Sequence, residues 1–256
     1  MIPNHLRYIY GLKDEQLQFY EFINIILAAR LWKPMQITIH TPKPLSGQWI
    51  DSLLASIPNL QIEIINKEIL DQCNYISHYA HKSDYLRLYF IYKMGGIYSD
   101  IDVFPYKSIR GLLKSTLPIL GEQRERGLCN AVILAPTEAG FIKKWLSSYT
   151  SFNNTEWDYH SVILPAILAA ENPEEVVTLP ASAFFEPQWH NQLQEILDAG
   201  MQFEGNGYCC HLWHTICKQV LQDISPEFIL ETPCFYSNVV RKVVNQKQLL
   251  TWKKMS

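Results

Sequence analysis

Two aspartates separated by a single residue, Asp100 and Asp102, have the spacing that most directly suggests chemistry in this 256-residue chain. They end an alternating apolar stretch that we expect to be a strand, and residues two apart on a strand point the same way. Aligned carboxylates repel each other unless a cation lies between them. Mn²⁺ or Mg²⁺ would suit, because these ions prefer oxygen ligands and keep positions open for phosphates. The alternative is a strand-end pair that only caps or pairs with Lys or Arg.

A second charged pair, Asp84 and Arg87, precedes these aspartates on a predicted helix over residues 78–94. Residues three apart share a helix face, so the two side chains should point the same way. Gly95 and Gly96 should end the helix, where a left-handed turn favours glycine. The strand that follows would then carry the two aspartates to the edge at which open α/β sheets bind ligands.

The first hundred residues alternate between strand and helix patterns, which predicts an α/β fold with a parallel sheet and helices on both faces. Predicted strands cover residues 6–10, 35–41, 60–65 and 97–103. Predicted helices cover residues 14–32, 46–57 and 78–94, with Ser46 as the N-cap of the second.

The second half of the chain has weaker patterns. Strands are expected at residues 117–121, 131–135, 176–179 and 208–212, and helices at 139–149 and 160–170. The segment from Phe228 onward is ambiguous. The simplest prediction is one domain over residues 1–256 with an irregular, mixed C-terminal half.

The composition is that of a globular protein, with 48% hydrophobic and 18% charged residues. A net charge of −3 disfavours nucleic-acid binding, which usually requires a basic surplus. Without an export signal or an apolar run near the roughly 20 residues that span a bilayer, we expect a cytoplasmic protein. Its six cysteines should then be mostly reduced, and the adjacent Cys209 and Cys210 are interpreted as small buried strand residues.

The segment SDYLRLYFIYKMGGIYSDIDV, residues 83–103, resembles the DxD region of a known family of glycosyltransferases. This family includes initiating α-1,6-mannosyltransferases, α-1,4-galactosyltransferases and glucosylating clostridial toxins. Weaker similarities flank the segment, at IPNHLRYIYG, PKPLSGQW, residues 121–134, LPASAFFEPQW (179–189) and HLW (211–213). The positions of the central motif are all filled, by Ser83, Asp84, Arg87, Gly95, Gly96, Tyr98, Asp100 and Asp102.

The resemblance implies a GT-A fold, with a nucleotide-sugar-binding part over about residues 1–105 and an acceptor-facing part over about 106–256. It also implies Asp102 as a direct ligand of Mn²⁺ or Mg²⁺, Asp100 as a ligand of the ribose or of the metal's water shell, and His211 as a metal or diphosphate contact. Arg87, Asp100 and Asp102 would be the catalytic residues. Residues expected to bind the donor are Tyr10, Ser83, Asp84, Arg87, Tyr98, Asp100, Asn130 and Trp213.

Two positions depart from the family pattern. Ser99 replaces a residue that is usually apolar, for which we expect only a packing change. His214 and Thr215 follow the H-x-W motif where a Ser-Trp pair is common, so the contacts of the closing segment should differ. Trp213 is expected to cover the donor, and the alternative is an ordinary core tryptophan.

Several other polar residues have competing interpretations. His40 is interpreted as structural, and Asp158 as an N-cap. Glu122 and Gln123 suit either ligand contact or a surface role. The basic tail beginning at Arg241 has two interpretations. The favoured one is a helix packed on its own domain, and the other is an interfacial membrane helix. His78 and His81 lie either in the cleft or at the helix start.

The resemblance therefore predicts a retaining, metal-dependent glycosyltransferase that moves a sugar from a UDP- or GDP-sugar to a glycan, glycolipid or protein acceptor. The alternatives are a nucleotide-sugar-binding protein without turnover and a toxin-like enzyme that glycosylates a protein. Nucleic acid is not an expected partner, and peripheral membrane contact would involve the basic tail.

Overall fold

A seven-stranded sheet forms the centre of the protein in a computed structural model that describes residues 1–188 and 193–255. The strand order is β3-β2-β1-β4-β7-β6-β8. The first four neighbours run parallel, β7 is antiparallel to both β4 and β6, and β8 is parallel to β6. The bounds are β1 His5–Ile9, β2 Gln36–Thr41, β3 Leu60–Ile64, β4 Gly96–Ser99, β6 Ile119–Gln123, β7 Gly127–Ala135 and β8 Val177–Leu179.

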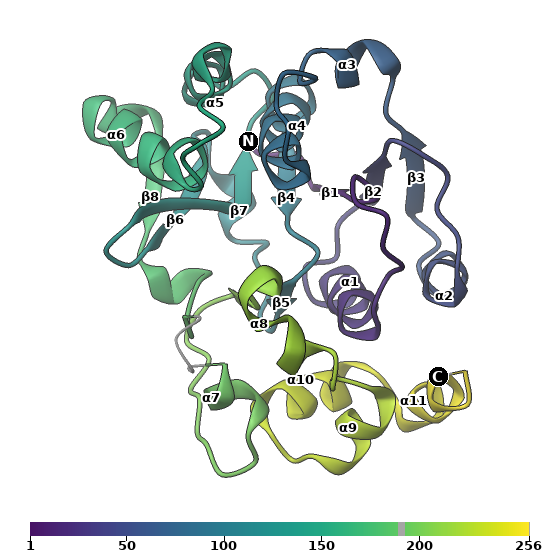
Figure 1. The fold of residues 1–256 in the computed structure, drawn as a ribbon. Helices are drawn as coiled ribbons and strands as arrows, with labels where there is room; N and C mark the ends of the chain where they lie inside the picture. The colour runs from purple at the N-terminus through teal and green to yellow at the C-terminus, as the bar shows by residue number, and fades with distance from the viewer. Residues whose placement is uncertain (189–192, 256) are drawn as a thin grey trace.

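Helices cover both faces of this sheet, as predicted (Figure 1). On one face lie α1 (Phe19–Leu31) and α2 (Gln48–Ser56), and on the other lie α4 (Tyr79–Met94), α5 (Gly140–Ser147) and α6 (Leu164–Glu171). Side-chain alternation along the strands separates two apolar cores, one on each face. The shorter helices in this part are α3 Lys67–Asp71, Leu112–Lys114, Ser148–Ser151, Tyr159–Ile163, Pro173–Glu175 and Ala181–Ala183.

Two short strands form a separate antiparallel ribbon, in which β5 (Val103–Pro105) pairs with β9 (Cys209–His211). Cys209 and Cys210 are fully buried in it and make no disulfide, which confirms their interpretation as small buried strand residues.

The C-terminal region is helical, and its yellow helices lie beside α1 (Figure 1). In the last helix, Leu249 and Trp252 are buried, and the Trp252 ring meets Phe22 of α1 edge-on at 4.8 Å. The tail thus packs on its own domain, which is the favoured alternative. Within the described residues, no helix has the length and apolarity to cross a bilayer. The bounds are α7 Gln194–Leu197, α8 His214–Leu221, α9 Pro226–Glu231, α10 Phe235–Val243 and α11 Gln246–Lys253.

The predicted strand over residues 97–103 is wrong in one important respect. Strand β4 ends at Ser99, residues 100–102 form a turn, and a different strand begins at Val103. The backbone N–H of Asp100 still donates to Ala131 of β7, while that of Val103 donates to the Asp100 carbonyl and closes the turn. Strand alternation therefore does not explain why the two aspartates converge.

Three other local predictions need correction. The first helix begins at Phe19, because Gln18 and Glu21 form a capping box there and residues 14–18 stay non-helical. The N-cap of α2 is Gly47, not Ser46. Asp158 makes no capping hydrogen bond and forms a 2.7 Å ion pair with Arg126 instead. Trp189, the last residue of the LPASAFFEPQW similarity, lies outside the described residues.

Candidate active site

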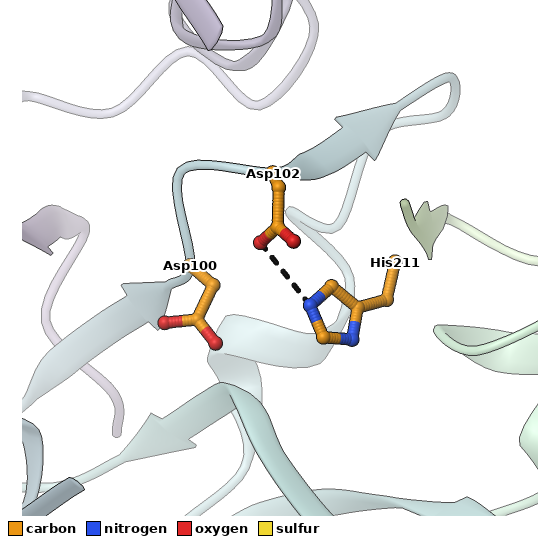
Figure 2. A group of neighbouring side chains, drawn as sticks. All are labelled: Asp100, Asp102 and His211. Atoms are coloured by element: carbon orange, nitrogen blue, oxygen red, sulfur yellow. Dashed lines mark hydrogen bonds and ion pairs between the residues drawn. The ribbon is translucent and has the colours of Figure 1, made fainter. Parts of the chain in front are cut away.

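The ribbon of β5 and β9 brings together an acidic and a basic side chain that are 109 positions apart in sequence. Val103 pairs with His211 in register, and the Leu212 N–H donates to the Asp102 carbonyl at 2.9 Å. Asp102, next to Val103, thereby faces the imidazole of His211, with 3.1 Å between Oδ1 and Nε2 (Figure 2). Main-chain pairing thus sets the relative position of these two side chains.

Asp100 completes a group of three potential metal ligands with Asp102 and His211 (Figure 2). One ligand atom from each side chain lies within 4.8 Å of the other two. Carboxylate oxygens combined with one imidazole nitrogen suit a borderline-hard divalent ion, so the residues present fit the expected Mn²⁺ or Mg²⁺.

Asp102 and His211 each shift the pKa of the other. Burial alone would lower the pKa of His211, but the Asp102 carboxylate outweighs it and raises that pKa to about 10. Burial would likewise raise the pKa of Asp102, but His211 and the His214 N–H lower it to about 2. The two side chains therefore form a buried ion pair, and a metal ion held by His211 would take the place of the imidazolium proton.

Arg87 is the second fixed cation of the site, and it is only 4% exposed. Its guanidinium donates to Asp100 Oδ2 and to both the backbone and side-chain oxygens of Asn130, each at 3.0 Å. It also lies 3.3 Å from Asp84 Oδ1 and stacks on the Tyr98 ring at 4.6 Å. A surface ion pair, the alternative for Arg87 and Asp84, is excluded by this burial.

Two residues predicted to bind the donor lie behind the cavity wall. The Tyr98 hydroxyl donates to Asp100 Oδ1 at 2.6 Å, and Asn130 Nδ2 donates to Asp84 Oδ1 at 2.7 Å. Neither Tyr98 nor Asn130 lines the cavity itself. They therefore orient the aspartates in front of them, while Ser83 and the aspartates do reach the cavity.

The cavity has a volume of about 370 Å³, a size that suits a nucleotide-sized ligand. It is bordered by Asp84, Arg87, Asp100, Asp102 and His211. Tyr10, Glu21, Arg126 and Trp157 are among the other residues that line it. The cavity lies where β4 ends and where the chain enters α8, which is the sheet edge predicted from the sequence.

Trp213 lines the cavity and is also only 8% exposed. Its ring packs on His211 at 4.2 Å between centroids and on Phe185 at 6.4 Å. Its backbone is left-handed, with φ of 54°, and it immediately precedes α8. Trp213 therefore has properties of both alternatives, a packed tryptophan and a wall of the cavity.

Of the other histidines, His40 is buried and stacks on Phe90 at 3.8 Å, in agreement with a structural role. His78 is the N-cap of α4, and His81 lines the cavity with its Nδ1 3.3 Å from Asp84 Oδ2. Sequence reasoning missed His214, whose N–H donates to Asp102 Oδ2 at 2.8 Å and whose ring bonds the Tyr20 hydroxyl.

Solved structures share this architecture. The PaToxG glycosyltransferase matches with a TM-score of 0.56 at 17% identity, covering 67% of this chain and 70% of its own. Mouse xyloside xylosyltransferase 1 matches with a TM-score of 0.54 at 13% identity, covering 83% and 98% respectively. The fold defined by this sheet is the GT-A fold of glycosyltransferases.

Sequence comparison identifies the family, whereas the solved structures identify the fold alone. Residues 27–123 match the glycosyltransferase sugar-binding region containing the DXD motif. Glucan organizing enzyme 1 of Cryptococcus neoformans var. grubii serotype A is 32% identical over 273 positions, covering 99% of this chain and 74% of that protein. The chain belongs to the family of glycosyltransferases that contain the DXD motif.

Proposed function

We propose that the protein is a metal-dependent, retaining hexosyltransferase that uses a UDP- or GDP-sugar. The observation that carries this proposal is the convergence of Asp100, Asp102 and His211 beside the buried Arg87 in one cavity. A binding protein without turnover would not need to keep this whole set. The name of the fungal relative favours a glycan acceptor over a protein or a glycolipid.

In this proposal, Asp102, His211 and Asp100 hold Mn²⁺ or Mg²⁺. The ion, when bound, neutralises the negative charge that grows on the departing diphosphate. Arg87 is held by several acceptors, so its charge is preorganised toward the same region and adds electrostatic stabilisation of the transition state. Asp84 would accept from hydroxyls of the donor sugar, and Tyr10 would lie near the base.

The transfer itself breaks the bond between the anomeric carbon and the diphosphate oxygen. The acceptor oxygen forms its new bond to that carbon on the same face, and its proton passes to the leaving phosphate oxygen. No side chain of the site is required as the base in this scheme. Trp213 and the start of α8 would exclude water, which favours transfer over hydrolysis.

We further propose that residues 1–105 form most of the nucleotide-sugar-binding part and that residues 106–256 face the acceptor. His211 and Trp213 would reach the donor from the second part. A cytoplasmic location and membrane contact through the tail stay predictions.

The test is a panel of UDP- and GDP-sugars with Mn²⁺, scored for sugar transfer and for release of the nucleoside diphosphate. Asp102→Asn should lower both by at least about 10²-fold, as expected when an electrostatic contact to the transition state is lost. Asp223→Asn, at an exposed aspartate, is the matched control and should leave them unchanged. Full activity of Asp102→Asn, or activity that survives EDTA, would sink the metal-dependent scheme.

A further inference from the structure

Trp157 is an exposed tryptophan at the mouth of the cavity. Its exposure is 55%, whereas the other five tryptophans that the structure describes are at most 8% exposed. It lies in the loop before the helical turn Tyr159–Ile163 and lines the same cavity as Arg87 and Asp100. The cavity wall therefore includes one large apolar ring that remains accessible to a ligand.

Two histidines contact the Trp157 ring: His81 in α4, and His78, which is the N-cap of α4. His78 and His81 meet it edge-on, with centroids 5.1 and 4.9 Å away and interplanar angles of 72° and 61°. His81 is 4% exposed and is itself tied to Asp84 at 3.3 Å. The indole is thus contacted by two rings and is still 55% exposed, as a binding platform requires.

A continuous series of contacts places Trp157 relative to the proposed donor. It runs from Asp100 through Arg87 and Asp84 to His81, and from there to Trp157. If the diphosphate binds beside Asp100 and Asp102, and the donor sugar lies over Asp84, Trp157 follows the donor sugar in this series. An acceptor that approaches the sugar from this end of the series would meet the Trp157 ring.

Polar groups line the same cavity as the ring. Arg126 and Asp158 form a 2.7 Å ion pair with side chains 53% and 23% exposed, and Gln123 is buried. A pyranose has an apolar C–H face and a rim of hydroxyls. An aromatic face bordered by charged and amide groups matches both parts.

We propose that Trp157 is the stacking platform for the acceptor sugar, with Arg126, Asp158 and Gln123 as partners for its hydroxyls. The ligand class is a pyranose ring of a glycan. This inference rests on the proposed function and assigns the acceptor side of that same site. It also requires that Trp157 contributes little to donor binding, which separates it from an extension of the donor site.

The experiment compares wild type with Trp157→Ala, Trp157→Phe and the control Ile167→Ala, an exposed apolar residue outside the cavity. Initial rates are measured against methyl glucoside, methyl galactoside and methyl mannoside, and separately against the donor. For Trp157→Ala, the KM for the acceptor should rise about tenfold while the KM for the donor changes less than about twofold. Trp157→Phe should recover part of the loss, and Ile167→Ala should match wild type.

Binding of the same methyl glycosides is followed by saturation-transfer NMR in the presence of the nucleoside diphosphate and Mg²⁺. Signals present in wild type should weaken in Trp157→Ala, with thermal unfolding confirming that each variant is folded. An unchanged acceptor KM, a raised donor KM, or no glycoside binding by wild type overturns the platform. Failure of wild type to release the nucleoside diphosphate from any donor would instead contradict the proposed function.

Discussion

Arg87 shows how a single buried cation can serve both stability and chemistry. Arg87→Ala would leave Asp84 and Asp100 without their partner, so a loss of activity would be accompanied by about 3–5 kcal/mol of lost stability. Arg87→Lys keeps the charge but cannot form the forked set of hydrogen bonds. We expect Arg87→Lys to retain most of the stability and still to lose at least about 10²-fold in transfer.

Urea unfolding and transfer rates, measured on both Arg87 variants, separate these two effects. Wild-type activity in Arg87→Lys would mean that only the charge matters and that the hydrogen-bond geometry does not.

Glu21 is a buried carboxyl group in the wall of the cavity. Burial raises its pKa from 4.5 to about 7, although the Gln18 N–H donates to it. Between these two pH values, the folded chain keeps a proton that the unfolded chain releases. The free energy of unfolding should therefore fall as the pH rises from about 5 to 7, by roughly 3 kcal/mol from this group.

Glu21→Gln should remove this pH dependence, because the amide stays neutral and can still accept from Gln18. Denaturant unfolding at pH 5, 6, 7 and 8 tests it, with exposed Glu68→Gln as the control. The variant should be about as stable as wild type at pH 5 and more stable at pH 8. If the free energy of unfolding changes with pH in the same way for wild type and Glu21→Gln, the pH dependence does not come from the raised pKa of Glu21.

Residue-scale reasoning from sequence succeeded where a compact motif supplied both residue types and spacing. Asp84, Arg87, Asp100 and Asp102 do converge. Trp157 was not singled out, because a lone tryptophan in a polar loop carries no spacing signal and its importance comes from its exposure in three dimensions.

At the scale of elements, Gly96 is the position where β4 passes closest to β1. Its φ is 106°, and a Cβ built there would lie 2.4 Å from the backbone oxygen of His5. Gly96→Ala should destabilise the protein by at least about 2 kcal/mol, because both the backbone conformation and the strand contact resist it. The urea-unfolding midpoint measures this effect.

Gly111→Ala is the matched control for Gly96→Ala. Gly111 has a φ of −62°, and a Cβ added there would meet no atom within 4 Å, so alanine should be neutral or slightly stabilising. Equal midpoints for the two variants would contradict the packing argument.

Element boundaries were the least predictable level of the fold. The run from Ile97 to Val103 alternates as a strand does, yet the chain turns at Asp100. Contacts with other elements define this turn, because Ala131 accepts from the Asp100 N–H and Arg87 of α4 donates to the Asp100 carboxylate. Both partners are distant in sequence, so no local pattern could reveal the break. Capping at Gln18, by contrast, is local and could have been recognised.

For the whole molecule, the fold class followed from sequence because alternating periodicities over the first hundred residues determine a parallel sheet covered on both faces. The C-terminal helices were ambiguous for the opposite reason. They are short, and their stability comes from packing on α1 through residues such as Trp252 and Tyr236, whose hydroxyl donates to Asn24. Helices of six to nine residues contain too few turns for their period to be recognised in the sequence, even where one face is clearly apolar, as in α10.

The ribbon of β5 and β9 would position the ligands of a metal ion before the ion binds. Backbone pairing fixes Asp102 opposite His211, and a proton shared with the imidazole holds them there. The conformational entropy of assembling the ligands is thus lost when the chain folds, not when metal arrives. A metal ion would thus meet ligands that are already in place, and it would displace the proton that lies between them.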